Sequence, residues 1–340
     1  MSLGPLMIDL EGYTINDAER KLLQHPLVGG VILFSRNYES IEQINYLATE
    51  IHALRKPKLL IAVDHEGGRI QRFKKDFFHL PACAKLGEIY EQNNRQAIGL
   101  AEQMGWLLAA ELRAVGIDFS FAPVLDLGRN ISTVIGDRAL HSNPEVVSEL
   151  AHAIMLGMRK AGMIAVGKHF PGHGSIATDS HIAVPVDERR FVDMQFEDLV
   201  PFERMIKYGL AAIMPAHVIY PQIDSQPAGF SSRWLQSILR KKYEFQGVII
   251  SDDICMAGAV IIGDPVTRAT RALQAGCDMI LICNDRDVAI QVIDNLGKYN
   301  SPASQMRLMR LHGKPALNWH NLHVNQKWQQ IQKNLTSYLA

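Results

Sequence analysis

The segment from residue 168 to residue 181 concentrates side chains that can transfer protons or bind a substrate. It begins with Lys168 and His169, contains a second histidine at position 173, and ends with Asp179-Ser-His181. Imidazole changes its charge near neutral pH, so such a cluster suits general acid and base catalysis. The proline and glycines within the segment disfavour a helix and predict an adjustable loop after a short strand at 163–166. A single histidine beside an apolar run is more often structural, but this clustering favours a catalytic site.

The elements that must position this loop follow a regular alternation. Short apolar runs are separated by segments with helical periodicity, of which 98–115 and the segment that begins at Asn143-Pro144 are the clearest. Eight such alternations favour an α/β fold with a (β/α)8 TIM-type barrel over an open doubly wound sheet. We expect one catalytic domain over 1–340, with the barrel at about 4–300 and C-terminal helices and a tail at about 301–340. The expected strands are 5–8, 28–34, 59–63, 117–121, 163–166, 210–214, 247–250 and 278–282.

In a TIM barrel the reactive groups lie after the strands, at the face where the strand C-termini gather. This chain has polar residues at those places: Asp64-His65-Glu66, Asp126, Lys168-His169, His217 and Ser251-Asp252-Asp253. For any one of them a cap, turn or surface role is the better explanation. Their shared position after strands predicts a single polar rim.

Composition limits the function classes. The formal net charge is zero and 47% of the residues are hydrophobic, so a large core is expected and a general nucleic-acid binder is not. We find no secretion signal and no apolar run long enough for a membrane span, so we expect a cytoplasmic protein, and a monomer. The four cysteines lack a CxxC spacing and are interpreted as reduced structural thiols.

The residues of this polar rim are compatible with several types of reaction, of which we consider two first. A metal-dependent hydrolase would recruit His169, His173, His181, His217 and an aspartate, although no His-x-His pair follows the first strand. A Schiff-base aldolase would use Lys168 as an amine nucleophile, which requires a depressed pKa. No GxxxxGK[ST] motif is present, so nucleotide cofactors are not indicated. We expect neither a cofactor nor a required metal.

Glycoside hydrolysis would use different residues of the same polar rim, namely a nucleophile and a proton donor. One carboxylate attacks the anomeric carbon and a second group protonates the departing oxygen. Asp252 follows an apolar strand that would hold it rigidly for attack. Asp179 can orient His181 and raise its pKa, which leaves a proton available for the leaving group.

At these residues the chain resembles the β-N-acetylglucosaminidases of glycoside hydrolase family 3, in particular the compact bacterial enzymes of peptidoglycan recycling. The resemblance covers nearly the whole barrel. It rests on the following segments: Gly4-Pro-Leu-Met-Ile-Asp-Leu-Glu-Gly12, His25-Pro-Leu-Val-Gly-Gly-Val-Ile-Leu-Phe34, Val63-Asp-His-Glu-Gly-Gly-Arg-Ile-Gln-Arg-Phe73, Phe121-Ala-Pro-Val-Leu-Asp126, Lys168-His-Phe-Pro-Gly-His-Gly174, Asp179-Ser-His181, Ser251-Asp-Asp253 and Ala275-Gly-Cys-Asp-Met-Ile-Leu281.

The resemblance implies a retaining exo-β-N-acetylglucosaminidase (EC 3.2.1.52) that acts on GlcNAc linked to anhydro-N-acetylmuramic acid, including its peptide-bearing forms. It implies that Asp252 is the nucleophile and that His181, paired with Asp179, is the acid/base. The implied sugar-binding residues are Asp64, Arg72, Arg138, Lys168 and His169. A β-glucosidase of the same fold and a non-catalytic sugar-binding barrel are the alternatives.

Three places depart from the family pattern. His65 stands where a glutamine is expected, Leu140 where an aromatic residue is common, and Cys255-Met256-Ala257 where Ser-Met-Glu is usual. Larger family members carry a second α/β domain that can contribute to the active site, and we expect none in this chain. If the acid/base comes from the barrel itself, Asp179 and His181 are the best available source, and we expect a flexible segment from Gly172 to Thr178 to bring them over the bound substrate.

Overall fold

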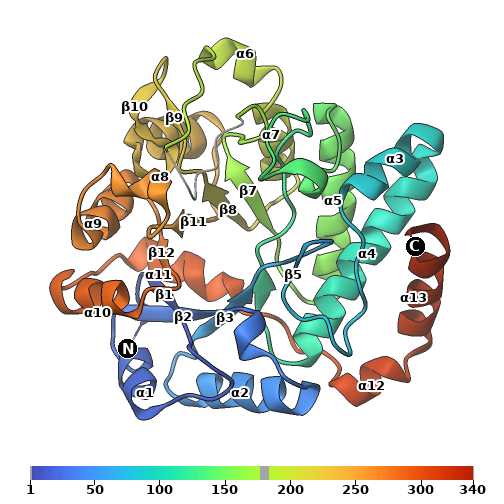
Figure 1. Cartoon of the computed structure of the whole chain (residues 1–340), viewed down its shortest axis with the longest axis horizontal. Coiled ribbons are helices and arrows are strands. Elements are labelled where there is room, and N and C mark those ends of the chain that lie inside the picture. The colour runs from blue at the N-terminus through green and yellow to red at the C-terminus, as the bar shows by residue number, and fades with distance from the viewer. Residues whose placement is uncertain (1, 177–183, 340) are drawn as a thin grey trace.

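Eight parallel strands form a barrel at the centre of the molecule, shown in Figure 1. The computed structural model describes residues 2–176 and 184–339. Each barrel strand except the fourth pairs with the next barrel strand along the chain, and the last strand returns to pair with the first. Bridges from Phe119 to Ile164 and from Val124 to Lys168 join the remaining two edges. The predicted (β/α)8 barrel is confirmed. Its strands are β1 (Leu6–Asp9), β2 (Val28–Leu33), β3 (Leu60–Val63), β6 (Phe119–Ser120), β7 (Val166–Phe170), β8 (Ala212–Pro215), β11 (Val248–Asp253) and β12 (Met279–Ile282).

Helices surround the barrel and connect its strands, as Figure 1 shows. Between the strands lie α1 (Asp17–Leu23), α2 (Ile41–Ala53), α3 (Ala84–Gln92), α4 (Asn94–Ala114), α5 (Pro144–Lys160), α6 (Phe191–Gln195), α7 (Leu199–Lys207), the π-helix η4 (Arg233–Lys242), α8 (Ala257–Val260) and α9 (Pro265–Ala275). After β12 come α10 (Arg286–Asn295), α11 (Pro302–Leu308), α12 (Trp319–His323) and α13 (Gln326–Leu339). Two short hairpins interrupt the alternation of strands and helices: β4–β5 (His65–Gly67 and Ile70–Gln71) and β9–β10 (Ile219–Tyr220 and Asp224–Pro227). Short 3-10 turns lie at Ser35–Asn37, Gly136–Arg138, Ala228–Phe230 and Met309–Leu311.

The two helices with the clearest periodicity form as expected. Asn143 caps α5 through a bond from the Glu145 backbone N–H, and Pro144 occupies the first turn, where its missing N–H costs nothing. Helices α4 and α5 approach each other closely because each presents a glycine at the crossing. A Cβ at Gly105 would lie 2.2 Å from the Ile154 carbonyl oxygen, and one at Gly157 would lie 2.0 Å from that of Glu102.

Seven of the barrel strands overlap the strands predicted from the apolar runs, but the predicted position of the fifth strand, β7, was wrong. The apolar run predicts a strand at 163–166, whereas β7 runs from Val166 to Phe170 and contains Lys168 and His169. Hydrophobic patterning excludes a lysine from a buried strand. Here the Lys168 side chain is only 3% exposed and is paired with carboxylates at the barrel mouth, which permits it inside the sheet.

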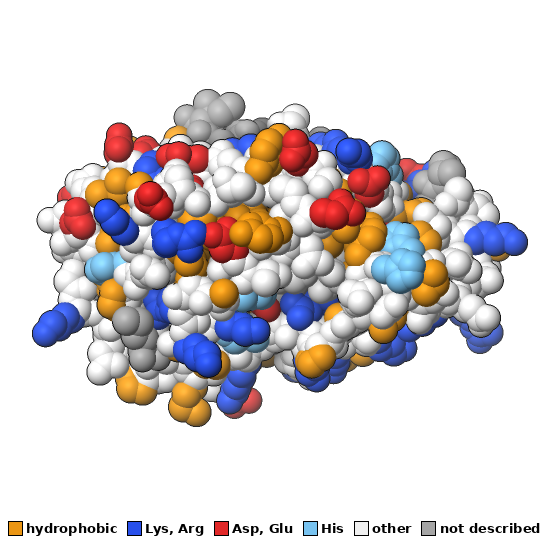
Figure 2. Space-filling view, turned by 90° about the horizontal axis from the view of Figure 1, so that it is seen from below, with side chains coloured by type: hydrophobic (Ala, Val, Ile, Leu, Met, Phe, Trp, Pro, Cys, Tyr) orange, Lys and Arg blue, Asp and Glu red, His pale blue; other side chains and the backbone are white. Residues whose placement is uncertain are grey.

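The C-terminal helices pack on the barrel and are tied to it by buried carboxylates. Asp118 accepts bonds from the backbone N–H groups of Ile61 and Gly313, and thereby links β3 to the chain that leads into α12. Glu111 of α4 accepts a bond from the Trp328 indole of α13. No helix in the described part of the chain is long and apolar enough to cross a membrane. On the face in Figure 2, charged side chains of both signs are interspersed with hydrophobic ones.

Candidate active site

A cavity of about 220 Å³ opens at the C-terminal ends of the barrel strands. That volume corresponds to about seven water molecules, which is the scale of one sugar ring. Every predicted site residue in the described part of the chain lines it: Asp64, Arg72, Arg138, Lys168, His169 and Asp252. These residues come from five segments of the sequence. Arg138, which comes from the short 3-10 turn at Gly136–Arg138, reaches the cavity with the others.

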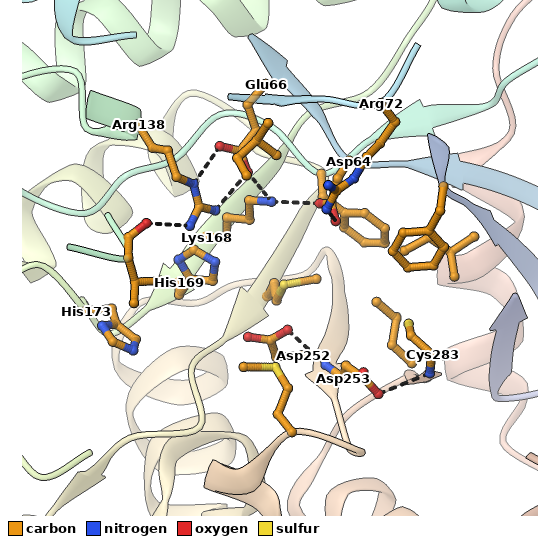
Figure 3. A pocket seen from close by; sticks show the side chains of 18 of the residues that line it. Asp64, Glu66, Arg72, Arg138, Lys168, His169, His173, Asp252, Asp253 and Cys283 are labelled. Atoms are coloured by element: carbon orange, nitrogen blue, oxygen red, sulfur yellow. Dashed lines mark hydrogen bonds and ion pairs between the residues drawn. The ribbon is translucent and has the colours of Figure 1, made fainter. Parts of the chain in front are cut away.

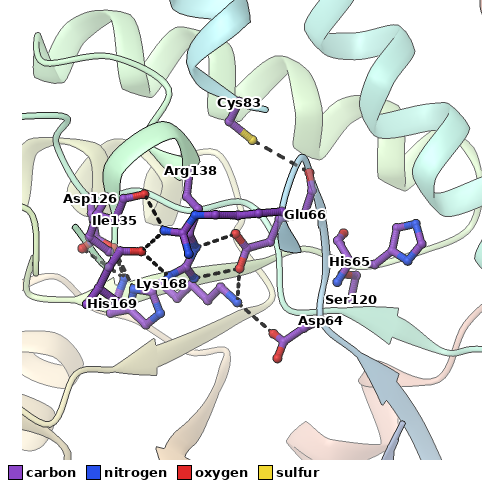
Figure 4. A network of polar contacts seen from close by, with 12 residues as sticks. Asp64, His65, Glu66, Cys83, Ser120, Asp126, Ile135, Arg138, Lys168 and His169 are labelled. Atoms are coloured by element: carbon purple, nitrogen blue, oxygen red, sulfur yellow. Dashed lines mark hydrogen bonds and ion pairs between the residues drawn. The ribbon is translucent and has the colours of Figure 1, made fainter. Parts of the chain in front are cut away.

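Lys168 lies between two carboxylates that project from one side of an extended segment. Asp64 and Glu66 are two residues apart at the start of the β4–β5 hairpin, so they point the same way. The Lys168 ammonium contacts Asp64 at 3.0 Å and Glu66 at 2.6 Å. Arg138 donates two bonds to Glu66, each of 2.8 Å, and Arg72 contacts Asp64 at 3.4 Å. Figure 4 shows the contacts that join Asp64, Lys168, Glu66 and Arg138, and Figure 3 shows Arg72 beside Asp64.

Asp64, Glu66 and Lys168 each favour the charged form because of their partners. Burial alone would raise the pKa of Asp64, but Lys168 and Arg72 hold it below its ordinary value. Burial likewise opposes ionisation of Glu66, whose pKa Lys168 and Arg138 lower. The pKa of Lys168 is raised by Asp64 and Glu66 against the effect of burial. A Schiff-base lysine needs the opposite shift, so the aldolase alternative finds no support here.

Asp126 organises the chain on the other side of Lys168. Its carboxylate contacts the His169 ring nitrogen Nδ1 at 2.7 Å and accepts bonds from the backbone N–H groups of His169 and His173. Burial would raise the pKa of Asp126, and His169 lowers it. One buried carboxylate therefore fixes both the ring of His169 and the backbone that follows β7.

Asp252 stands at the end of β11 and faces the cavity, as Figure 3 shows. Its Oδ1 accepts a bond of 2.8 Å from the Asp253 backbone N–H. The Asp253 carboxylate accepts bonds from the Cys255 and Cys283 backbone N–H groups and so joins the ends of β11 and β12. Burial, aided by the charge of Asp252, raises the pKa of Asp253 to about 7. Asp252 is thus held by strand geometry with its carboxylate directed into the cavity.

The predicted acid/base pair, Asp179 and His181, lies outside the described residues. The segment before it differs from the expected adjustable loop. Lys168 and His169 belong to β7, and the next turn is fixed, because the carbonyl of Gly172 accepts a bond of 2.7 Å from the Tyr220 hydroxyl. A Cβ at position 174 would lie 2.0 Å from the Leu127 carbonyl oxygen, so Gly174 packs directly on that backbone.

Sequence reasoning assigned no role to Glu66, which is 3% exposed and joins Arg138 to Lys168. The Asp-x-Glu spacing was the available signal, since alternate residues of an extended strand share a side. Gly67 ends β4 and Gly68 begins the turn to β5, and both have positive φ. His65, one of the departures from the family pattern, is buried against the rings of Phe73 and Phe77 and does not line the cavity.

The other departures also involve packing. Leu140 is 1% exposed and its carbonyl oxygen closely approaches Gly87. Cys255 contributes its backbone N–H to Asp253. All four cysteines are free, with Cys83, Cys277 and Cys283 buried. In the ranges 2–176 and 184–339, no three His, Cys, Asp or Glu side chains converge on a position for one metal ion.

The family model for the glycosyl hydrolase family 3 N-terminal domain matches residues 5–311. The chain belongs to glycosyl hydrolase family 3. It is therefore a glycoside hydrolase, and the resemblance seen in its motifs is confirmed. It is 57% identical over 329 residues to a β-hexosaminidase of Thioalkalivibrio sulfidiphilus, covering 97% of this chain and 94% of that protein. A β-hexosaminidase of Hydrogenovibrio crunogenus is 53% identical over 339 residues, covering 100% and 95% of the two chains.

Solved structures of the family share this architecture. NagZ from Neisseria gonorrhoeae, in complex with N-trifluoroacetyl-D-glucosamine, superposes with a TM-score of 0.95 at 42% identity and covers 100% of this chain and 99% of its own. A family 3 β-N-acetylglucosaminidase from a Paenibacillus superposes with a TM-score of 0.87 at 28% identity. This chain spans 67% of that longer protein.

Proposed function

We propose that this protein is a retaining exo-β-N-acetylglucosaminidase that releases terminal β-linked GlcNAc. The observation that carries the proposal is Asp252, which faces a sugar-sized cavity across from the ordered cluster of Asp64, Glu66, Arg138 and Lys168. Relatives more than 50% identical over nearly the whole chain are β-hexosaminidases, which supports GlcNAc as the sugar.

In the proposed reaction Asp252 attacks the anomeric carbon and forms a covalent glycosyl-enzyme. His181, oriented by Asp179, protonates the leaving oxygen and then deprotonates the water that releases GlcNAc. Asp64, Arg72, Arg138, Lys168 and His169 bind the sugar. Ion pairs with one another, with Glu66 and with Asp126 fix these residues before substrate arrives, so little reorganisation is needed on binding.

We further propose that the natural substrate is GlcNAc linked to 1,6-anhydro-N-acetylmuramic acid, with or without its peptide, and that the enzyme acts as a cytoplasmic monomer in peptidoglycan recycling. The family 3 motifs shared with compact bacterial enzymes support this substrate. The decisive comparison is the rate of GlcNAc release from this disaccharide and from chitobiose. A clear preference for chitobiose would contradict the recycling assignment while leaving the hydrolase activity standing.

The sugar class and the stereochemistry are tested with aryl glycosides. We expect release from aryl β-N-acetylglucosaminide in the presence of a chelator, with β-GlcNAc as the first product seen by proton NMR. Faster release from the matching β-glucoside would favour the β-glucosidase alternative. Loss of activity with the chelator would favour a metal-dependent hydrolase, and an α-configured first product would exclude the retaining mechanism.

A further inference from the structure

His173 is a buried histidine in the cavity wall that the proposed mechanism does not use. It is 3% exposed and lines the cavity beside His169 and Asp252. Within the described part of the chain, neither of its ring nitrogens has a hydrogen-bond partner. A buried polar group without a partner is destabilising, and native proteins rarely keep one without a reason. Its position in the cavity wall indicates that the bound ligand supplies the partner.

The backbone around His173 is fixed although its ring makes no hydrogen bond. The His173 N–H donates a bond of 2.7 Å to Asp126 Oδ1. On either side, Gly172 has a φ of +134° and is bonded to Tyr220, and Gly174 packs against the Leu127 backbone. This local structure holds the ring at one place on the cavity wall, as a preformed binding site requires.

The ring lines the cavity together with the sugar-binding residues and the nucleophile, and its surroundings favour the neutral form. Burial lowers the pKa of His173, although Asp126 opposes this and Asp252 does so weakly. A neutral imidazole offers one donor and one acceptor. Its centroid is 6.3 Å from that of His169. In Figure 3, His173 and Arg138 lie on one side of the cavity and Asp64 and Arg72 on the other, with Asp252 between them.

The positions of Asp252 and His173 in the cavity indicate which part of a bound sugar each residue would contact. Asp252 must face C1 in the proposed mechanism, and the two ring positions next to C1 are C2 and the ring oxygen. Of these two, only C2 carries a substituent that can both donate and accept a hydrogen bond, which matches a neutral imidazole. GlcNAc carries at C2 an amide with one donor, one acceptor and a methyl group. Val134 and Ile135 line the cavity, and the carbonyl of Val134 is bonded to Arg138 Nη1 at 3.1 Å. Their apolar side chains supply a surface for the methyl group.

We propose that His173 is a specificity-determining residue that hydrogen-bonds the 2-acetamido group of the substrate. The inference rests on the proposed N-acetylglucosaminidase function and extends it to a residue outside the predicted sugar-binding set. The ring accepts a bond from the amide N–H or donates one to the amide carbonyl. A hydroxyl at C2 also donates and accepts, but it is shorter than the acetamido group, so a ring placed to bond the amide is too far from it for the same contact.

The test compares aryl β-N-acetylglucosaminide with aryl β-glucoside for the wild type and His173→Ala. We expect kcat/KM for the N-acetyl substrate to fall about 10-fold, and that for the glucoside to change less than about 2-fold, as loss of one hydrogen bond implies. His173→Phe retains a ring without hydrogen-bonding atoms and should show the same selective loss if His173→Ala does not fold. His320→Ala, at an exposed histidine of α12, is the matched control and should change neither value.

Equal losses on both substrates, or no loss on either, would overturn the role of His173. A wild-type enzyme that releases no GlcNAc would instead refute the underlying function. A crystal structure of the wild type with GlcNAc provides a test independent of variants. A ring nitrogen of His173 within about 3.2 Å of an acetamido nitrogen or oxygen supports the proposal, as hydrogen-bond geometry requires. A separation too long for a hydrogen bond would contradict it.

Discussion

Replacing Glu66 by glutamine should weaken both the fold and the site. The Glu66 side chain is 2% exposed and makes three charge-assisted contacts, one of 2.6 Å to Lys168 and two of 2.8 Å to Arg138. Removing one partner of a buried ion pair costs about 3–5 kcal/mol, since the remaining charges stay buried. An unfolding entropy of about 2.1 cal/mol/K per residue gives about 0.7 kcal/mol/K for 340 residues. The melting temperature should therefore fall by about 4–7 °C.

Activity should fall with it, because Lys168 and Arg138 lose the carboxylate that aligns them. Displacement of binding groups by about 1 Å costs about 100-fold in rate, which is the loss we expect in kcat/KM. Calorimetry and aryl glycoside kinetics measure the two effects. Glu88→Gln removes a surface pair with Lys85 and should change stability by less than about 1 kcal/mol. If Glu66→Gln melts within 1 °C of this control and keeps wild-type activity, the contacts of Glu66 with Lys168 and Arg138 contribute neither to stability nor to activity.

Three further changes test separate parts of the account. Asp252→Ala should lower kcat for an aryl N-acetylglucosaminide by about 10⁴-fold or more with little change in melting temperature, and near-normal turnover would remove the nucleophile assignment. His181→Ala should slow substrates with poor leaving groups by about 10²–10⁴-fold and activated aryl substrates far less, whereas equal losses across a leaving-group series would argue against an acid role. Burial raises the pKa of Glu111 to about 7. The folded state then holds this proton more tightly than the unfolded state, and stability falls as pH rises from about 4.5 to 7. Glu111→Gln should flatten this pH dependence by removing a difference on the order of 3 kcal/mol between pH 4 and pH 8 in urea unfolding, and an unaltered pH dependence would refute this.

The barrel could be predicted from the sequence because its strands are short, buried runs with turn signals between them. The exception, β7, shows the limit of that rule. In the sequence, the charge of Lys168 predicts that the apolar strand ends before it. Only the fold brings Asp64 and Glu66, from the start of the β4–β5 hairpin, close enough to neutralise that charge. Pairing between strands distant in the sequence leaves no trace in local periodicity.

Six residues that line the cavity could be named from the sequence one by one, but their contacts with one another could not. The motifs identified Asp64, Arg138 and Lys168 singly, whereas Glu66 joins them through a contact across 72 residues of chain to Arg138. His173 belonged to a cluster that also suited a metal. Its separate role emerged from the fixed backbone around it and from ring nitrogens without partners in the described part of the chain.

The central claim, covalent catalysis by Asp252, is tested most directly by trapping the intermediate. The enzyme would be treated with a slow fluorinated GlcNAc analogue, digested, and examined by mass spectrometry. We predict one added glycosyl group on the peptide that contains Ser251-Asp252-Asp253, located at Asp252, and no adduct in the Asp252→Ala variant. An adduct on another residue, or continued turnover of the analogue by that variant, would contradict the account.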